Sequence, residues 1–227
     1  MRGQKLNVPA DLGVVTSVAA GIYHTVVILH NGSVHCWGGQ NGRGQLDVPA
    51  GHGVVTSVAA GDYFTVFTVV LLENGNVHCW GNNRYGQCDV PEDLGRVTSV
   101  AAGRAHTVVV LHNGSVRCWG DNYSGMCDVP SDLGVVTSVA AGCHHTVVVL
   151  HNGTVRCWGF SVYGQCNVPT DLGAVTSVAC SNHTVFLLED GTVHCWGRNE
   201  YGQCDVPVDL GRVGPGEPLT KSAVRQS

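Results

Sequence analysis

Short apolar runs rich in β-branched residues recur along the chain, with glycine-containing turns between them. Residues 97–119 contain two such runs, VTSVAA and HTVVVL, and a third, SVRCW, follows an Asn-Gly pair. β-branched residues favour strands. Asn-Gly or Asp-Gly between apolar runs predicts a two-residue type I′ hairpin turn. No window shows a 3.6-residue apolar period, so the pattern predicts an all-β chain.

These runs belong to a unit that is repeated five times. VTSVAAG begins at Val15, Val55, Val97 and Val136 and returns as VTSVACS at Val175. The resulting units are residues 14–53, 54–95, 96–134, 135–173 and 174–211. Residues 1–13 contain GQKLNVPADLG, the end of a further unit, and are expected to form a partial repeat or closing segment. Residues 212–227 are polar and are expected to be disordered.

The unit pattern predicts a β-propeller. HTVVVL is apolar at consecutive positions, so both faces of its sheet must be covered. A short fourth strand is expected around GQCDV, and a period near 40 with four strands per unit is typical of propeller blades. Closure of five blades, assembly with another chain and membership of a larger propeller are all compatible with this pattern.

The repeat resembles that of the regulator of chromosome condensation superfamily. The segment AAGRAHTVVVLHNGSVRCWGDNYSG, from Ala101 to Gly125, shows the resemblance. The VP after GQ is most similar to the bacterial β-lactamase-inhibiting member, and the similarity spans residues 3–213. The resemblance implies a β-propeller and three roles: regulation of a small GTPase, the propeller portion of a HECT-type ubiquitin ligase, or inhibition of a secreted enzyme such as a β-lactamase.

Charge and hydropathy exclude two classes of partner. Charged residues make up 13% of the chain, the formal charge is −5, and no two basic residues are adjacent, so no direct nucleic-acid partner is expected. The longest apolar run, residues 64–72, is less than half of the roughly 20 residues that span a bilayer, so no membrane partner is expected. The first residues lack the apolar core of a signal peptide, which predicts a cytoplasmic or nuclear location.

The cysteines form a recurring C-x8-C pattern, in Cys79/Cys88, Cys118/Cys127, Cys157/Cys166 and Cys195/Cys204. The first unit keeps Cys36 but carries Leu46 at the second position. Leucine fits a buried apolar slot, and free cysteine packs as a small apolar residue. The spacing typical of zinc ligands is absent. We therefore expect structural thiols, ahead of disulfides and of metal ligands, and we expect no metal and no cofactor.

The repeated histidines and tryptophans are interpreted as structural. Histidine fills the GxxHT position in four units, and Phe64 is assigned to it in the second. A phenylalanine cannot replace a general base, so a hydrogen bond inside the fold is the simpler role. No catalytic motif is found, and a lyase or hydrolase site in the central channel is the rival interpretation. The structural positions are His24, His106, His145, His183, Trp37, Trp80, Trp119, Trp158 and Trp196.

Positions that vary between units lie in two loops, one before the repeated histidine and one after Trp-Gly. Variable loops on a rigid scaffold commonly carry function, and tyrosine and arginine commonly anchor protein interfaces. The sequence therefore predicts a non-enzymatic scaffold that docks a protein partner through its loop face, with self-assembly as a further possibility. The predicted contact residues are Tyr23, Asp62, Tyr63, Arg84, Tyr85, Arg104, Tyr123, His144, Phe160, Tyr163, Arg198 and Tyr201.

Overall fold

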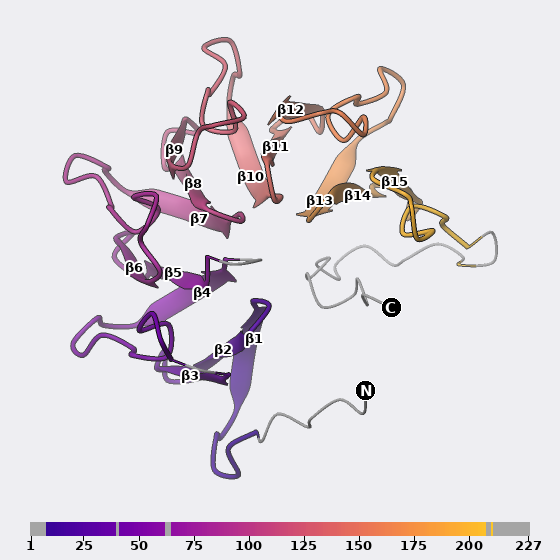
Figure 1. The fold of residues 1–227 in the computed structure, drawn as a ribbon. Coiled ribbons are helices and arrows are strands. Elements are labelled where there is room, and N and C mark those ends of the chain that lie inside the picture. The colour runs from indigo at the N-terminus through magenta and orange to yellow at the C-terminus, as the bar shows by residue number, and fades with distance from the viewer. Residues whose placement is uncertain (1–7, 40, 62–64, 208–209, 211–227) are drawn as a thin grey trace.

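The computed structural model describes residues 8–39, 41–61, 65–207 and 210. Within these ranges the chain forms five three-stranded antiparallel sheets, which are arranged as blades around a common centre (Figure 1). This confirms the predicted all-β propeller with five repeats. The described residues contain no helix, and hence none able to cross a membrane. The predicted tail, residues 212–227, lies outside these ranges, as do residues 1–7 of the partial repeat.

Each blade takes its three strands in chain order from one repeat. Blade 1 contains β1 (Val15–Ala20), β2 (His24–Leu29) and β3 (Val34–Gly38); blade 2 contains β4 (Val55–Ala60), β5 (Phe67–Leu72) and β6 (Val77–Gly81); blade 3 contains β7 (Val97–Ala102), β8 (His106–Leu111) and β9 (Val116–Gly120); blade 4 contains β10 (Val136–Ala141), β11 (His145–Leu150) and β12 (Val155–Gly159); blade 5 contains β13 (Val175–Cys180), β14 (His183–Leu188) and β15 (Val193–Gly197).

The strand register brings the two variable loops of a blade together. In blade 3, β7 pairs with β8 so that Ala102 faces Thr107, and β8 pairs with β9 so that His106 faces Gly120. The loop before β8 and the loop after β9 therefore leave the same end of the sheet. The Asp121 N–H joins them by donating to the carbonyl of Ala105 at 2.8 Å. We call this end of each blade the loop end.

The turn between the second and third strands differs from the expected two-residue type I′ turn. In blade 1 the Gly32 N–H donates to the carbonyl of Leu29 at 2.8 Å, and the Leu29 N–H donates to the carbonyl of Ser33 at 2.9 Å. His30 and Asn31 are thus the central residues, and Gly32 follows at a φ of 77°. This is a three-residue hairpin that ends in a glycine bulge. The Asn31 side chain accepts the Ser33 N–H at 3.0 Å, which favours this geometry.

The prediction of a fourth strand around GQCDV is also wrong for the blades that the structure describes. In blade 2 this segment forms turns, and its backbone groups form no backbone pairs with a neighbouring strand. The Cys88 N–H donates to Asn83 Oδ1 at 2.8 Å, and the Asp89 N–H donates to the Gly86 carbonyl at 3.1 Å. The segment therefore acts as a folded loop at the edge of the blade.

The hydrophobic core lies between the blades. The second strands of blades 2, 3 and 4 are covered on both faces, as their runs of apolar residues predict; Val108 and Val109 of β8 are both 0% exposed. One cluster joins Val108 to Val136 and Val139 of the next blade. Burial of apolar surface between neighbouring sheets therefore supplies the main stabilisation of the fold.

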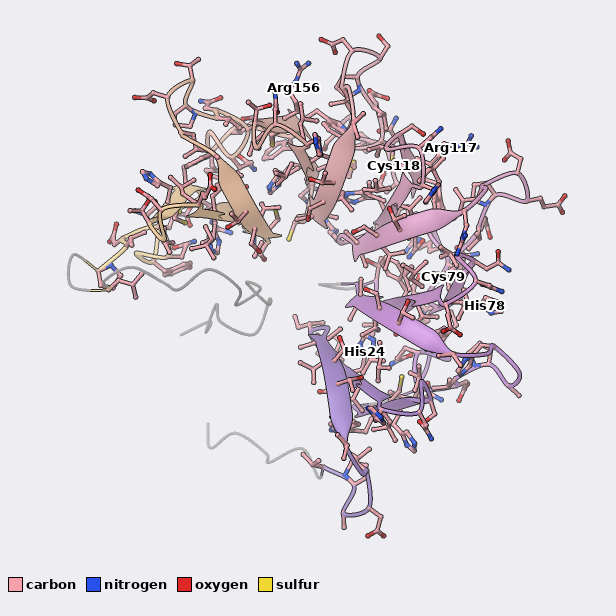
Figure 2. The ribbon with its side chains drawn as sticks, turned by 180° about the vertical axis from the view of Figure 1, so that it is seen from behind. His24, His78, Cys79, Arg117, Cys118 and Arg156 are labelled. Atoms are coloured by element: carbon pink, nitrogen blue, oxygen red, sulfur yellow. A yellow bond between two sulfur atoms is a disulfide. The ribbon has the colours of Figure 1, made fainter. Side chains whose placement is uncertain are left out.

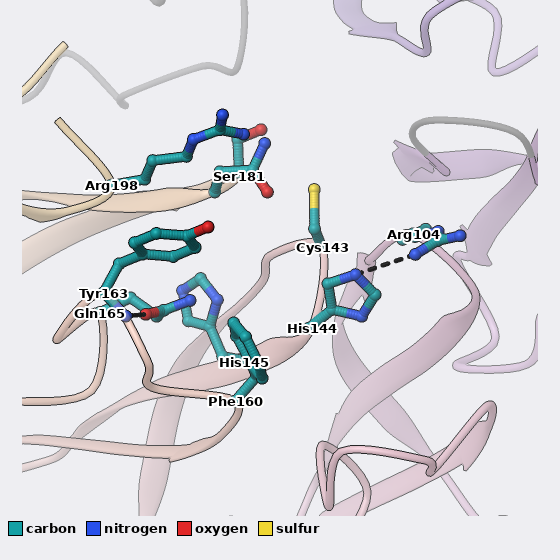
Figure 3. A pocket seen from close by; sticks show the side chains of 10 residues that line it. Arg104, Cys143, His144, His145, Phe160, Tyr163, Gln165, Ser181 and Arg198 are labelled. Carbon is teal, nitrogen blue, oxygen red and sulfur yellow. Dashed lines mark hydrogen bonds between the residues drawn. The ribbon is translucent and has the colours of Figure 1, made fainter. Parts of the chain in front are cut away.

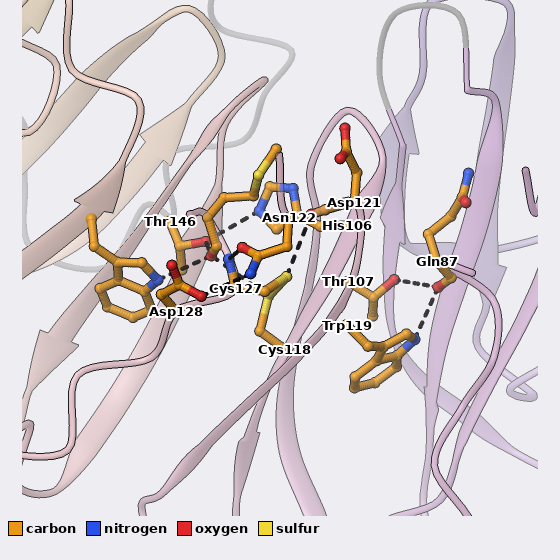
Figure 4. Close-up of a disulfide and its surroundings, with 12 residues drawn as sticks. Gln87, His106, Thr107, Cys118, Trp119, Asp121, Asn122, Cys127, Asp128 and Thr146 are labelled. Carbon is orange, nitrogen blue, oxygen red and sulfur yellow. Dashed lines mark hydrogen bonds between the residues drawn. A yellow bond between two sulfur atoms is a disulfide. The ribbon is translucent and has the colours of Figure 1, made fainter. Parts of the chain in front are cut away.

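Polar contacts repeat at the same junctions. His106 Nε2 lies 3.1 Å from Thr146 Oγ1 of the next blade. Thr107 Oγ1 and Trp119 Nε1 both donate to the carbonyl of Gln87, which belongs to the loop of the preceding unit, at 2.8 and 3.0 Å (Figure 4). The loops of units 1 to 4 thus reach over to the following blade, and the repeated histidines of blades 1, 3 and 4 bond forward to a threonine.

Blade 2 departs from this pattern, and the assignment of Phe64 to the histidine position is wrong. Phe67 faces Gly81 across the sheet, as His24 faces Gly38 in blade 1. The insertion in this unit therefore precedes the strand, which moves the equivalent position by three residues. The sequence alone could not place the gap because consecutive apolar residues allow several alignments.

The five blades form an open arc among the described residues. The first strand of each later blade packs on the first and second strands of the blade before it, whereas no comparable packing joins blade 5 to blade 1 (Figure 1). We call the side of a blade that meets its predecessor the leading face, and the side that meets its successor the trailing face. Figure 2 shows His24 between blades 1 and 2, while Arg117 and Arg156 point away from the centre.

Candidate functional site

A cavity of about 250 Å³ lies at the loop end of blades 3 to 5 (Figure 3). Its walls come from the loops before the second strands of all three blades and from the loops after β12 and β15. The lining residues are Arg104, Cys143, His144, His145, Phe160, Tyr163, Gln165, Ser181, Asn182 and Arg198. The cavity is therefore built where the loop ends of neighbouring blades converge.

Glycines let these loops approach one another closely. A Cβ at Gly103 would lie 2.2 Å from His106 Cε1 and 2.6 Å from the carbonyl oxygen of Gly142. Such distances exclude a side chain, so the glycine that precedes the variable pair is required by packing. A Cβ at Gly142 would likewise lie 2.6 Å from the Ser181 carbonyl oxygen, and this close approach lets the Cys143 N–H donate to that carbonyl at 2.9 Å, which fixes the loops of blades 4 and 5 together.

One side of the cavity is formed by Arg104 and His144. Arg104 Nη1 donates to His144 Nε2 at 2.9 Å (Figure 3). Burial and the positive charge of Arg104 lower the pKa of His144. Its imidazole is therefore neutral at physiological pH and accepts the arginine proton, so the charge on this side belongs to Arg104.

The opposite side is formed by Tyr163 and Arg198. The guanidinium carbon of Arg198 lies 5.8 Å from the centre of the Tyr163 ring and 5.9 Å from that of Tyr201, within the range of cation–π attraction. Arg198 also pairs with Glu200. Its Nε is buried and makes no hydrogen bond within the described part of the chain.

Phe160 connects the two sides. Its ring centre lies 6.0 Å from that of His144 and 6.3 Å from that of Tyr163, both in edge-on arrangements. A continuous series of side chains therefore runs across three blades, from Arg104 through His144, Phe160, Tyr163 and Arg198 to Tyr201. We call these six residues the docking row. Cations near both ends and aromatic rings between them suit a ligand that is anionic and partly apolar.

All six residues of the docking row are among the twelve contact residues expected from the sequence. Of the others, Arg84 and Tyr85 form a cation–π pair in blade 2 at 5.8 Å, and Tyr23 lies in blade 1. Tyr123 is 95% exposed. Asp62 and Tyr63 lie outside the described residues. The structure thus places five of the twelve predicted residues around one cavity, with Tyr201 beside them, and places Tyr23, Arg84, Tyr85 and Tyr123 elsewhere.

Several lining residues were missed. Cys143 and Asn182 occupy variable positions of the loop before the histidine, so position within the repeat was a signal for them, whereas Ser181 stands where the other units have glycine. Gln165 was missed because the Gly-Gln pair recurs in four units. It is only 3% exposed, and its Oε1 accepts the Tyr163 N–H at 3.0 Å, so it shapes the loop that carries Tyr163.

His145, expected to be structural, also lines the cavity. Its Nε2 lies 2.9 Å from Thr184 Oγ1 of blade 5. Burial lowers its pKa to about 4, so the ring is neutral at physiological pH. Within the residues that the structure describes, no group of three histidine, cysteine or acidic side chains could hold a metal ion.

The expectation that all cysteines are thiols is wrong for two pairs. Cys118–Cys127 and Cys157–Cys166 are disulfides, each closing the loop after the third strand of its blade (Figure 4). In the other two pairs the sulfur atoms of Cys79 and Cys88 lie 2.8 Å apart, and those of Cys195 and Cys204 lie 2.9 Å apart. The folded loop places both sulfurs together in every blade that has both.

The lone cysteine of blade 1 explains why sequence reasoning failed here. Cys36 is free and packs against the cluster between blades 1 and 2, so it has a packing role without a partner. Burial raises its pKa to about 12. Retention of one cysteine beside Leu46 therefore did not exclude disulfides in the other units.

Comparison with known proteins agrees with this architecture. Residues 15–45, 55–87, 97–125, 136–165 and 175–203 match the Regulator of chromosome condensation (RCC1) repeat. No curated protein sequence matches the chain. The finer resemblance to a β-lactamase-inhibiting member is not confirmed by these matches.

Solved structures with a similar fold include two plant receptor ectodomains and a yeast protein. The Physcomitrella patens receptor kinase CR4 ectodomain is 25% identical with a TM-score of 0.69, and the match covers 83% of this chain and 53% of that one. The Arabidopsis thaliana receptor kinase ACR4 ectodomain is 23% identical with a TM-score of 0.63, and the match covers 81% of this chain and 63% of that one. Prp20p from Saccharomyces cerevisiae is 19% identical with a TM-score of 0.71, and the match covers 86% of this chain and 60% of that one. The chain thus spans between about half and two thirds of the length of these structures.

Proposed function

The chain belongs to the family of RCC1-repeat proteins, and on that premise we propose that it is a non-enzymatic propeller that binds a protein partner through the docking row. The observation that carries the proposal is the pair of arginines, Arg104 and Arg198, placed on opposite sides of one cavity with aromatic rings between them (Figure 3). Arginine and tyrosine in a concave, partly desolvated setting are typical anchors of protein interfaces.

The chemistry of the row points to an acidic segment of the partner. Guanidinium groups bind carboxylates through paired hydrogen bonds, and Arg198 already pairs with one carboxylate, that of Glu200, which a carboxylate of the partner would join or replace. Phe160 and Tyr163 offer apolar surface beside these donors. Neutral His144 adds no charge of its own. A glutamate or aspartate next to an apolar residue would match both features.

The rigid scaffold supports this role because it fixes the row before binding. The loops that carry it are joined by backbone hydrogen bonds, such as Phe160 N–H to the His144 carbonyl at 2.9 Å. A disulfide between Cys157 and Cys166 closes the loop that carries Phe160 and Tyr163. Preorganised side chains lose less conformational entropy on binding.

The structural neighbours support a protein partner in general and identify none. The Prp20p structure is described together with binding to Gsp1p and histones, and yeast RCC1 (Prp20) has been crystallised with Kap60. At 19% and 20% identity these similarities concern the fold alone. Regulation of a small GTPase is therefore a narrower version of the proposal, and a captured GTPase would favour it.

Affinity purification with matched variants tests the proposal. Arg104→Ala/Arg198→Ala should lose a protein that the wild-type chain recovers, because both anion-binding groups are removed. Arg117→Ala/Arg156→Ala removes the same charge from exposed arginines that pair with Asp93 and Asp132, and should retain that protein. With the purified partner, the first variant should bind roughly thirtyfold more weakly or worse. Equal recovery by both variants would show that the row is not the binding site.

A further inference from the structure

The leading face of blade 1 is exposed, whereas the preceding blade covers the same face in each of the other four blades. Val15 and Val18 of β1 are 38% and 48% exposed. The equivalent residues in blade 3, Val97 and Val100, are 4% and 8% exposed, because β4 and β5 of blade 2 cover them. Blade 1 therefore presents an apolar surface that the repeat has evolved to bury between blades.

Polar groups on this face also lack the partners that they have elsewhere. In blade 3, Thr107 and Trp119 donate to the Gln87 carbonyl of the preceding unit. The equivalent Thr25 and Trp37 make no side-chain hydrogen bond among the residues that the structure describes. Both are half-buried, whereas Thr107 is fully buried.

The trailing face of blade 5 is incomplete in the complementary way. The repeated histidine bonds forward to a threonine from blades 1, 3 and 4, but His183 has no such partner within the described ranges. Val185 of β14 is half-buried, whereas its equivalents in the other four blades are all 0% exposed. These are Val26, Val69, Val108 and Val147.

We propose that the trailing face of blade 5 in one copy of the chain docks on the leading face of blade 1 in a second copy. The occupant follows from the contacts inside the chain, which form the same junction four times between blades of this repeat. His183 of blade 5 would bond to Thr25 of blade 1 in the second copy. This contact would give both side chains the partners that they lack among the described residues. The valines on the two faces would become buried at the same time.

This contact is heterologous, because two different surfaces meet. Such contacts leave one free face of each kind at the ends of any open assembly, so association continues until a ring closes or a filament forms. The proposal is independent of the docking row, because the row lies at the loop end and the contact lies on the flat faces of the blades.

Sedimentation velocity over a wide range of concentration tests the proposal. The average mass of the wild-type chain should rise with concentration, either to that of a closed ring of copies or without limit as filaments form. Val18→Lys blocks the leading face and Val185→Lys blocks the trailing face, so each variant alone should remain a monomer. Val162→Lys replaces a valine that is 75% exposed in the loop of blade 4 and should associate as the wild type does.

An equimolar mixture of the two blocked variants separates this contact from any other. Val18→Lys keeps a working trailing face and Val185→Lys keeps a working leading face, so the mixture should form a dimer and stop there. Circular dichroism confirms that each variant is folded. A monomeric wild-type chain at all concentrations, association that survives Val18→Lys, or a mixture that stays monomeric would each overturn the proposal.

Discussion

Blades 2 and 3 are built from the same repeat but differ in how they join the blade that follows. Blade 3 meets blade 4 through the His106 to Thr146 contact, and blade 2 meets blade 3 through the ring of Phe67, which is 0% exposed. Blade 3 also has the Cys118–Cys127 disulfide where blade 2 has two free sulfurs.

The difference shows which features of a junction are required. Both junctions bury a second-strand valine completely, Val69 in blade 2 and Val108 in blade 3. Both also keep the loop carbonyl that accepts from the tryptophan of the next blade. Apolar burial and the loop contact are therefore common to both, whereas the histidine and the disulfide are additions whose contributions can be measured separately.

The largest effect is expected at the ring that replaces the histidine. Phe67→Ala removes a fully buried ring and leaves a cavity between blades 2 and 3, which should lower the free energy of unfolding by about 3–5 kcal/mol. Urea unfolding followed by tryptophan fluorescence measures this. Tyr123→Ala, at a side chain that is 95% exposed, is the control and should change stability little.

The histidine junctions should weaken in acid, and the phenylalanine junction should not. Burial lowers the pKa of His24 from 6.5 to about 4, so the unfolded chain binds the proton first as pH falls. The stability that His24 contributes is complete above pH 6.5 and is lost progressively down to pH 4, by about 3 kcal/mol. Urea unfolding across this range measures the slope.

Two exchanges test the assignment of this slope. His24→Phe should remove part of the pH dependence, because the junction of blades 1 and 2 would then contain a ring that does not bind a proton, like the ring of Phe67 in blade 2. Phe67→His should add to it, because Thr107 already stands where a histidine would bond forward. A pH profile that neither exchange alters would contradict the role of these histidines.

Removing the paired cysteines should lower the free energy of unfolding more in blade 3 than in blade 2, though by less than the loss of Phe67. Cys118→Ser/Cys127→Ser removes a crosslink between two cysteines that are nine positions apart. Under oxidising conditions this should lower the free energy of unfolding by about 2–3 kcal/mol. Cys79→Ser/Cys88→Ser removes no crosslink and should cost less. Non-reducing peptide mapping should recover the Cys118–Cys127 and Cys157–Cys166 linkages, and their absence would contradict the structure. In reducing buffer the two double variants should become alike.

The smallest difference in stability is expected between variants of the two junction threonines, Thr146 and Thr107. Thr146→Ala removes both the contact with His106 and the bond to the Met126 carbonyl, and should cost about 2 kcal/mol. Thr107→Ala removes only the bond to the Gln87 carbonyl and should cost about 1 kcal/mol. Urea unfolding of the two variants side by side measures the difference, and equal losses would show that His106 draws no stability from Thr146.

Much of the candidate site could be predicted because it lies at positions where the repeats disagree. Arg104, His144 and Phe160 stood out as departures from a consensus that otherwise serves packing. Their convergence on one cavity could not be predicted, because it depends on which blades are neighbours and on how far each loop extends. Cys143 was overlooked although it stands at a variable position, and Ser181 was overlooked because it replaces a glycine of the repeat that serves packing in the other units.

The sequence by itself determined the repeat, three strands in each unit and the apolar character of the second strand, because these depend on local preference and on a pattern that occurs five times. Only the tertiary structure decided the register of the inserted segment before Phe67, the pairing of sulfurs at Cys118 and Cys157, and the exposure of Val18. The sulfur pairing depends on how the loop after the third strand folds, the position of the insertion depends on how β5 pairs with β6, and the exposure of Val18 depends on the absence of a neighbouring blade among the described residues. A repeat specifies what every junction can be, and the assembled arc decides which junctions are made.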